Sequence, residues 1–320
     1  MDEEAERLVA ALGNLTEGAC AVAALIAFGE RAIAPLRRFL LEGRPSTVYQ
    51  PRRWAVQALG GLGAREVLME YLTSLPPAAD PQLRLAEEAV QNAAIREFLR
   101  WPGAETTAFL LGLSGNMMRA GLVEVFGKLR VVEAIPYLDR ALEDDGTRLA
   151  AEEALVAIGA PAREALILSA ITPLPKDDIE TPSSLRRRQS ALHVLAAIGI
   201  RREDWPRLGS LVLEEDPEIV TYSCMLAVKA GAVDGRDTVT ARLIAISGKA
   251  PWFLQDDIVE CLVAWFDTAQ PAIQSEIERR MRAPEIARVR DQALRLLLRV
   301  RRRAQSEGQA GTRRPGEHSC

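Results

Sequence analysis

A short pattern that closes on glycine recurs along this chain at a nearly constant spacing, and such a repeat restricts the possible folds more than any other feature. The clearest copies begin at Arg52, Arg148 and Arg188, and each closes with Leu-Gly or Ile-Gly. The closing positions are Gly29, Gly63, Ile95, Gly127, Gly159, Gly199 and Gly231. They are separated by 34, 32, 32, 32, 40 and 32 residues, and four equal steps rarely arise by chance.

The residues between closing positions predict two helices in each repeat. Every copy has apolar residues five positions and one position before its closing residue, and this separation of four places them on one side of a helix. Fifteen positions before the closing residue, five of seven copies have a side chain that can accept hydrogen bonds from a first helical turn. These predicted N-caps are Asn14, Asp80, Asp144, Ser184 and Asp216. Glycine then ends the helix, and a second amphipathic helix follows, as over 131–142.

A lone pair of such helices leaves its apolar face uncovered, so neighbouring pairs must stack on one another. The sequence therefore predicts an all-α fold, an α-solenoid of about eight to nine helix pairs. We expect an N-terminal capping helix over 1–13, regular repeats over 14–231, and irregular helical repeats with a cap over 232–303. A disordered basic tail is expected over 304–320.

The pattern resembles HEAT repeats, and most closely the phycobilisome-lyase-like subtype. The resemblance rests on the Ala-Leu/Ile-Gly endings, on the cap aspartates, and on arginines that open the first helices. Those arginines are Arg52, Arg84, Arg148 and Arg188, beside the caps Asp80, Asp144 and Asp216. The match covers about 14–231 well and 232–303 loosely, and it departs at Ile95, which replaces glycine, and at Gly18, Asn116 and Val220, which replace arginine. The resemblance implies a right-handed superhelix, whereas function depends on sites that differ among such folds.

Few residues suit catalysis. The chain has two histidines, His193 and His318, and it contains no GxxxxGK[ST] phosphate loop. The four cysteines form no CxxC pair, so we expect reduced thiols. Some HEAT-like proteins are di-iron hydroxylases that use repeated His-Glu pairs, which this chain lacks. We therefore predict no catalytic residues, no metal site and no cofactor, with His193 an ordinary packed or half-exposed residue.

The 40-residue interval places an inserted loop near 171–183, where three prolines oppose a helix. Asp177, Asp178 and Glu180 in this loop are candidate residues for partner binding or for a hard cation, although they lack EF-hand spacing. Insertions in repeat proteins form surface loops that often bind. A merely tolerated loop, neutralised by Arg186–Arg188, is the alternative.

Basic residues concentrate at the C-terminal end. Between Arg279 and Arg314, twelve arginines face three acidic residues, a local charge of +9 in a chain of net charge −4. Arg295, Arg299, Arg302 and Arg303 recur at helical spacing and can share one face. They form a solvated helix face or an anchor for an acidic protein, RNA or an anionic membrane surface.

The N-terminus is acidic and lacks the basic and apolar regions of a signal peptide. No apolar run reaches the roughly 18 residues of a membrane span, so we expect no transmembrane segment and a cytoplasmic location. The predicted function is a non-catalytic scaffold or adaptor that binds a protein or peptide along a concave helical surface. An accessory or catalytic subunit of a heteromeric chromophore (bilin) lyase is the alternative that the subtype resemblance implies. A nucleic-acid-binding HEAT-like protein is the third possibility.

Overall fold

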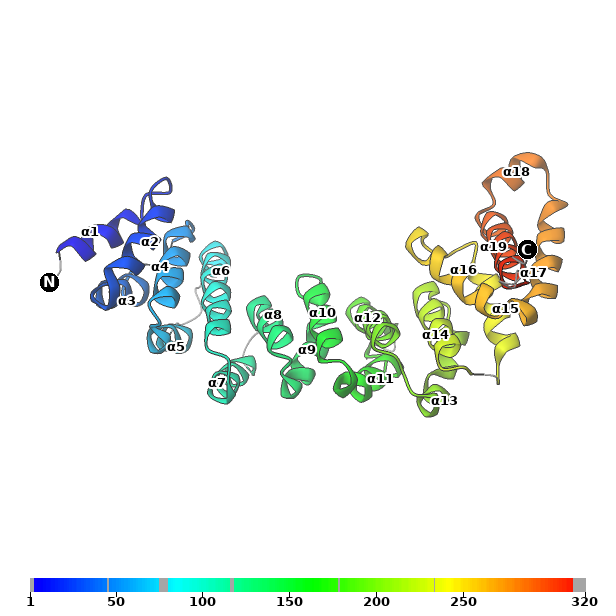
Figure 1. Cartoon of the computed structure of the whole chain (residues 1–320), viewed down its shortest axis with the longest axis horizontal. Coiled ribbons are helices and arrows are strands. Elements are labelled where there is room, and N and C mark those ends of the chain that lie inside the picture. Colours follow the sequence, from blue (N-terminus) through cyan, green and yellow to red (C-terminus); the bar gives the residue numbers. More distant parts are fainter. Residues whose placement is uncertain are drawn as a thin grey trace, which may run out of the picture. The chain divides into compact units, whose positions relative to one another are not determined.

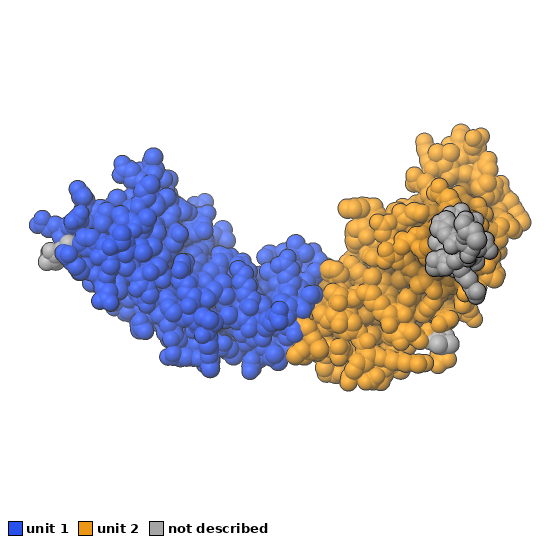
Figure 2. Space-filling model, in the orientation of Figure 1, with its two compact units in different colours: residues 1–158 blue, residues 159–320 orange. Residues whose placement is uncertain are grey.

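The computed structural model describes residues 3–44, 46–74, 80–115, 118–177, 179–232 and 234–312. The chain forms two compact units, Met1–Ile158 (unit 1) and Gly159–Cys320 (unit 2), coloured separately in Figure 2. Nearly all regular structure in the described residues is helical, which confirms the all-α prediction. The one sheet found there is a small antiparallel pair of β1 (Pro175–Lys176) and β2 (Ile179–Glu180).

Unit 1 contains helices α1 to α10. They are α1 (Glu3–Ala11), α2 (Gly18–Phe28), α3 (Ile33–Leu41), α4 (Gln50–Gly61), α5 (Arg65–Ser74), α6 (Pro81–Glu97), α7 (Ala104–Ser114), α8 (Ala120–Leu129), α9 (Ile135–Ala141) and α10 (Arg148–Ile158). Three short 3₁₀ helices, η1 (Gly29–Ala32), η2 (Phe98–Arg100) and η3 (Val132–Ala134), connect some of these.

The helices of unit 1 form two layers. The first helices of the repeats pack consecutively, α2 on α4, α4 on α6, α6 on α8 and α8 on α10. The second helices α3, α5, α7 and α9 lie along the other side of this layer (Figure 1). The predicted apolar column five positions before the closing residue is buried from the second repeat onward. In both units its buried members are Ala58, Val90, Leu122, Ala154, Val194 and Leu226.

Unit 2 contains helices α11 to α19. They are α11 (Arg163–Ile171), α12 (Pro182–Ile198), α13 (Trp205–Leu208), α14 (Pro217–Lys229), α15 (Arg236–Ile246), α16 (Gln255–Ala264), α17 (Phe266–Met281), α18 (Glu285–Arg290) and α19 (Gln292–Thr312). The 3₁₀ helices are η4 (Ala160–Ala162), η5 (Arg202–Asp204), η6 (Gly209–Leu213) and η7 (Trp252–Leu254). Here α12 packs on α14 and α14 on α16, while the long α19 packs on both α16 and α17 (Figure 1).

The predicted N-caps are confirmed at two aspartates and corrected elsewhere. Asp80 accepts hydrogen bonds from the N–H groups of Gln82 and Leu83, and Asp216 accepts equivalent bonds at the start of α14. Asp144 does not cap a helix, because its carboxylate accepts from the Gly146 N–H at 2.7 Å in a turn and α10 begins only at Arg148.

Two further predicted caps lie off the helix starts. Ser184 lies inside α12, which begins at Pro182 because Thr181 supplies the cap and proline is favoured in the first turn. Asn14 accepts a hydrogen bond from the Thr16 N–H at 2.9 Å, ahead of α2, which begins at Gly18.

Five of the six predicted glycine stops have a positive φ, which favours glycine: Gly29, Gly63, Gly159, Gly199 and Gly231. Gly127 is the exception, because it lies inside α8 and the helix ends at Arg130, whose φ is 52°. A side chain on Gly127 would bring its Cβ within 2.7 Å of the Ala154 Cβ on α10. Glycine is required there by the close approach of two helices, and not by a helix end.

A disordered tail is expected from residue 304 onward, and α19 continues into this segment. Helix α19 continues to Thr312, and an ion pair at 3.0 Å between Arg303 and Glu307, one turn apart, supports it beyond 303. Residues 313–320 lie outside the described residues.

The stretch Gly18–Leu41, which spans α2, η1 and α3, is long and apolar enough to cross a membrane, with a mean hydropathy of 1.6. The sequence-based prediction of no membrane span missed this stretch, because charged residues such as Glu30 and Arg37 divide it into shorter apolar runs. Length and composition alone decide this test, and core helices of soluble proteins meet it too. In the structure α2 packs on α1 and α4, and Arg37 pairs with Glu70 on α5.

Candidate partner-binding site

The predicted basic helix face is part of α19, and the packing of this helix decides which arginines are exposed. Ala293, Leu294, Leu297 and Val300 recur at spacings of one, three and three, and all are buried. This apolar stripe docks α19 on α16 and α17, as expected for a closing helix. The arginines therefore lie on the sides of α19 that the docking leaves uncovered.

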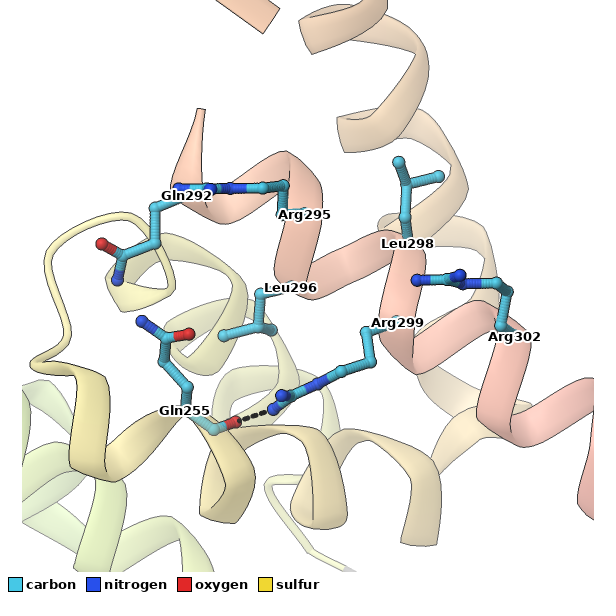
Figure 3. A pocket seen from close by; sticks show the side chains of 7 residues that line it. All are labelled: Gln255, Gln292, Arg295, Leu296, Leu298, Arg299 and Arg302. Carbon is cyan, nitrogen blue, oxygen red and sulfur yellow. Dashed lines mark hydrogen bonds between the residues drawn. The ribbon is translucent and has the colours of Figure 1, made fainter. Parts of the chain in front are cut away.

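A groove of 420 Å³ lies beside α19 where it crosses the start of α16. Arg295, Arg299 and Arg302 of α19 line it, and Figure 3 shows their guanidinium groups extending toward the same side. Gln255 and Gln292 lie at one end, and Leu296 and Leu298 complete the lining. The groove thus combines three cations, two carboxamides and an apolar floor.

The four predicted arginines differ in their partners. Arg299 donates to the Gln255 carbonyl oxygen at 3.0 Å and pairs with Asp256 at 2.7 Å. Arg303 does not line the groove, and instead it pairs with Glu307 and, at 3.8 Å, with Glu260 on α16. Within the described part of the chain, the guanidinium groups of Arg295 and Arg302 have no acceptor. These two side chains are therefore the cations of the groove that are open to a ligand.

Part of the +9 charge counted over 279–314 is neutralised by carboxylates outside that range, namely Glu276, Asp256 and Glu260. Glu276 on α17 accepts from both Arg279 and Arg280, and Arg280 also pairs with Asp291 at 2.8 Å. The hydrogen bonds from these arginines lower the pKa of Glu276 to about 2. The basic segment is therefore not a uniform cationic surface, and the open cations that line the groove are Arg295 and Arg302.

The acidic residues of the inserted loop do not form a cation site among the described residues. Asp177 lies at the tip of the β1–β2 hairpin with a φ of 52°, and Asp178 lies outside the described residues. The Glu180 carboxylate accepts from the Ser184 hydroxyl and from Arg188, both at 2.8 Å, so it stabilises the start of α12. No group of three or more potential metal ligands occurs in the described ranges.

The arginines of the repeat pattern are structural where they are buried. Arg52 donates to the Glu87 carboxylate at 2.6 Å and to the Leu40 carbonyl oxygen at 2.7 Å, which joins α4 to α6 and to the end of α3. Glu87 also accepts from the hydroxyl of Tyr71, and burial, followed by this carboxylate, raises the pKa of that hydroxyl above its ordinary value.

Arg188 repeats the arrangement of Arg52 in unit 2. It donates to the carbonyl oxygen of Ala170, near the end of α11, at 2.8 Å, and it pairs with Glu180 and Glu214. Arg84 and Arg148 hold the same position of the pattern but are more exposed, and the ion pairs of Arg148 are as long as 3.8 and 3.9 Å. The pattern therefore marks an inter-repeat link that only some repeats complete.

Exposed apolar residues of unit 1 concentrate on its first helices. Of the eight large apolar side chains that are exposed in its described residues, seven lie on these helices or on the segments that lead into them. They are Leu15, Ile26, Val48, Tyr49, Leu85, Leu149 and Val156, and the eighth is Val132 in η3. Leu85 and Leu149 lie ten positions before their closing residues, and Ile26 and Val156 lie three before.

A separation of seven residues returns to the same side of a helix, so these positions form one stripe that recurs in α2, α6 and α10. We call this stripe the first-helix face. The same separation of seven is present in the sequence, beside the apolar columns that predict the core.

Two shallow depressions lie between consecutive first helices. One of 220 Å³ lies between α8 and α10 in unit 1, where Glu124, Lys128 and Glu153 border small side chains. The other, of 210 Å³, lies between α12, α14 and α16 in unit 2 and includes His193 and Asp257. His193 is exposed there, with its ring centroid 5.3 Å from that of Tyr222. Burial, and then the nearby Glu260 and Asp256, raise the pKa of Asp257.

The cysteines differ in reactivity. Cys224 and Cys261 are buried, and burial raises the pKa of Cys261 to about 12 and that of Cys224 further, so both are thiols at neutral pH. Cys20 is exposed on α2.

No protein-family model matches this chain, and no curated protein matches it significantly. The surfaces described above are therefore the observations from which a function can be argued.

Proposed function

We propose that this protein is a non-catalytic helical-repeat scaffold of the HEAT type that binds a partner protein or peptide along its first-helix face, in the cytoplasm. The observation that carries the proposal is that four of the eight exposed large apolar side chains in the described residues of unit 1 lie on that face, whereas none lies on the second helices α3, α5, α7 and α9. Solenoids present one helix layer as an extended binding surface, and this proposal includes the solenoid arrangement of the repeats.

The exposed side chains are large enough to contribute to binding. Leu85 is 67% exposed and Leu149 is 65% exposed. Full burial of an exposed leucine side chain contributes about 1.5–3 kcal/mol. Burial of the exposed part of either side chain under a partner would therefore stabilise the complex by roughly 1–2 kcal/mol. Exposed apolar residues that recur on one surface, bordered by polar side chains, are typical of interaction sites.

The charge distribution favours a protein partner over nucleic acid. A nucleic-acid surface needs several free cations that track a phosphate backbone. Here Arg279, Arg280, Arg299 and Arg303 are paired with carboxylates of the chain itself, which reduces the number of cations that a phosphate backbone could contact. The chromophore-lyase alternative rests on the subtype resemblance alone, and binding of a bilin by the purified chain is the measurement that would favour it.

Site-specific photo-crosslinking in the native host tests the proposed function. A photoreactive amino acid replaces Leu85 or Leu149 on the first-helix face, and matched controls carry it at Glu66 of α5 and Ala108 of α7, which are exposed on second helices. We expect one and the same protein to crosslink to both first-helix positions and to neither control. Equal crosslinking at all four positions, or none at the first-helix positions, contradicts the proposal.

A further inference from the structure

We propose that the groove between α16 and α19 of unit 2 binds an extended acidic segment of a partner protein, with its Asp or Glu side chains on Arg295 and Arg302. This inference rests on the proposed scaffold function and names the chemistry of one partner segment. The two open guanidinium groups, on a groove that also has an apolar floor, are the observation that carries it.

The spacing of the two arginines suits an extended peptide. They are seven residues apart on α19, which corresponds to about 10.5 Å along the helix axis. Side chains three residues apart in a peptide of polyproline II conformation lie on the same side of it, about 9 Å apart. An acidic residue, two intervening residues and a second acidic residue therefore match the two guanidinium groups. Arginine can bind each carboxylate through two parallel hydrogen bonds.

The chain itself shows the contact that such a ligand would make. Arg299, which lies between Arg295 and Arg302, binds the carboxylate of Asp256 at 2.7 Å, and the Asp256 side chain is 84% exposed. Asp256 therefore neutralises Arg299, one of the three cations of the groove, and places a negative charge close to where a ligand would bind. Removing this charge, without removing the side chain, should strengthen the binding of an acidic ligand.

The walls of the groove are held in place by the fold. The Gln292 carboxamide donates to the Ala250 carbonyl oxygen at 2.7 Å, and Leu296 is buried against the unit. The Arg299 guanidinium is held by the hydrogen bond that it donates to the Gln255 carbonyl oxygen. The site is thus partly preorganised, which reduces the entropy lost when a ligand binds.

An acidic peptide fits this groove better than RNA. The lining contains no aromatic side chain on which a base could stack. Asp256 at the groove and Glu260 one turn further along α16 would repel a continuous phosphate backbone, whereas a peptide can place its few carboxylates on the arginines.

Fluorescence anisotropy with the full chain tests the inference. The probe is a labelled peptide that carries two glutamates three residues apart among neutral residues, and the reference probe has glutamine at both positions. The test variant is Arg295→Gln/Arg302→Gln. The matched control is Arg282→Gln/Arg290→Gln, which removes the same charge from two exposed arginines outside the groove. The gain variant is Asp256→Asn. Circular dichroism and thermal unfolding verify that each variant keeps its fold.

We expect the test variant to bind the acidic probe about tenfold more weakly than the wild type, because two exposed charge pairs are lost. The control should stay within about twofold, and Asp256→Asn should bind about two- to fivefold more tightly. Binding should weaken as salt rises from about 0.1 M to 1 M, because the Debye length shortens from about 10 Å to 3 Å.

Equal losses in the test and control variants would overturn the inference, since they indicate non-specific attraction. Weaker binding by Asp256→Asn, equal binding of the glutamine probe, or tighter binding of an RNA oligonucleotide of the same charge would overturn it as well. These outcomes are independent of the crosslinking at Leu85 and Leu149. If the acidic peptide does not bind the groove but crosslinks form on the first-helix face, the scaffold function stands without the groove inference. If the peptide binds but no crosslinks form, the groove is a peptide site and the scaffold function is contradicted.

Discussion

Replacement of Arg52 by methionine should destabilise unit 1 strongly. The side chains of Arg52 and Glu87 are only 5% and 10% exposed, and their charged atoms are 2.6 Å apart. Methionine fills much of the same volume but removes the cation. The Glu87 carboxylate then stays buried with the Tyr71 hydroxyl as its remaining donor among the described side chains. Breaking a buried ion pair in this way costs about 3–5 kcal/mol.

Two further variants separate this effect from a general loss of charge. Arg148 holds the same position of the repeat, but its side chain is 32% exposed and its nearest carboxylate, on Glu152, is 3.8 Å away. Arg148→Met should therefore cost less than about 1 kcal/mol. The double variant Arg52→Met/Glu87→Leu removes both charges, and it should be at least about 1 kcal/mol more stable than Arg52→Met alone.

Urea unfolding followed by circular dichroism measures these free energies, and hydrogen exchange assigns the transition to α4 and α6. The slope of unfolding free energy against urea should stay unchanged, so that the midpoints report stability. A loss below about 1 kcal/mol in Arg52→Met, or an equal loss in Arg148→Met, would refute the reasoning from burial.

Three other outcomes are expected. Asp80→Ala should lower the free energy of unfolding by about 1 kcal/mol because Asp80 caps α6, whereas Asp144→Ala should cost clearly less; equal shifts in the urea midpoint would contradict this difference. In a Cys320→Ser background, a thiol reagent at pH 8 should modify Cys20 alone in the folded protein, and all three remaining thiols in denaturant. Rapid reaction of a second thiol before unfolding would show that one of the buried cysteines is accessible. The pKa of Glu276 is lowered from 4.5 to about 2, so the contribution of its ionised carboxylate to stability is present above pH 4.5 and is lost as the pH falls toward 2. The difference in unfolding free energy between the wild type and Glu276→Gln should therefore vanish between these pH values, and a difference that stays constant with pH would contradict this.

The class of secondary structure and the approximate helix pattern could be predicted from local sequence alone. A 32-residue period, apolar spacing of four, aspartate before proline and glycine after a helix act within a few residues of one another. The caps at Asp80 and Asp216 and the positive-φ glycines at Gly159 and Gly199 were predictable for that reason. Helix boundaries were less predictable where two caps compete, as Thr181 and Ser184 do at the start of α12.

The candidate site could be predicted only in part. Helical spacing placed the four arginines on neighbouring turns of one helix, and the structure brings three of them to one groove. The spacing could not show that Asp256 and Glu260, about 40 residues earlier, neutralise Arg299 and Arg303. Coulomb interactions depend on distance in space, and a local charge count omits partners from other helices.

The sequence by itself therefore determined that this chain forms capped, amphipathic helices in a repeating order, since those properties depend on contacts within one turn or one helix. Only the tertiary structure decided what equivalent positions do. Gly63 ends a helix at a φ of 74°, whereas Gly127 has the same place in the pattern and lies where two helices touch. Likewise Arg52 is a buried link between repeats, while Arg148 is partly exposed, because burial is a property of the neighbouring helices and not of the residue itself.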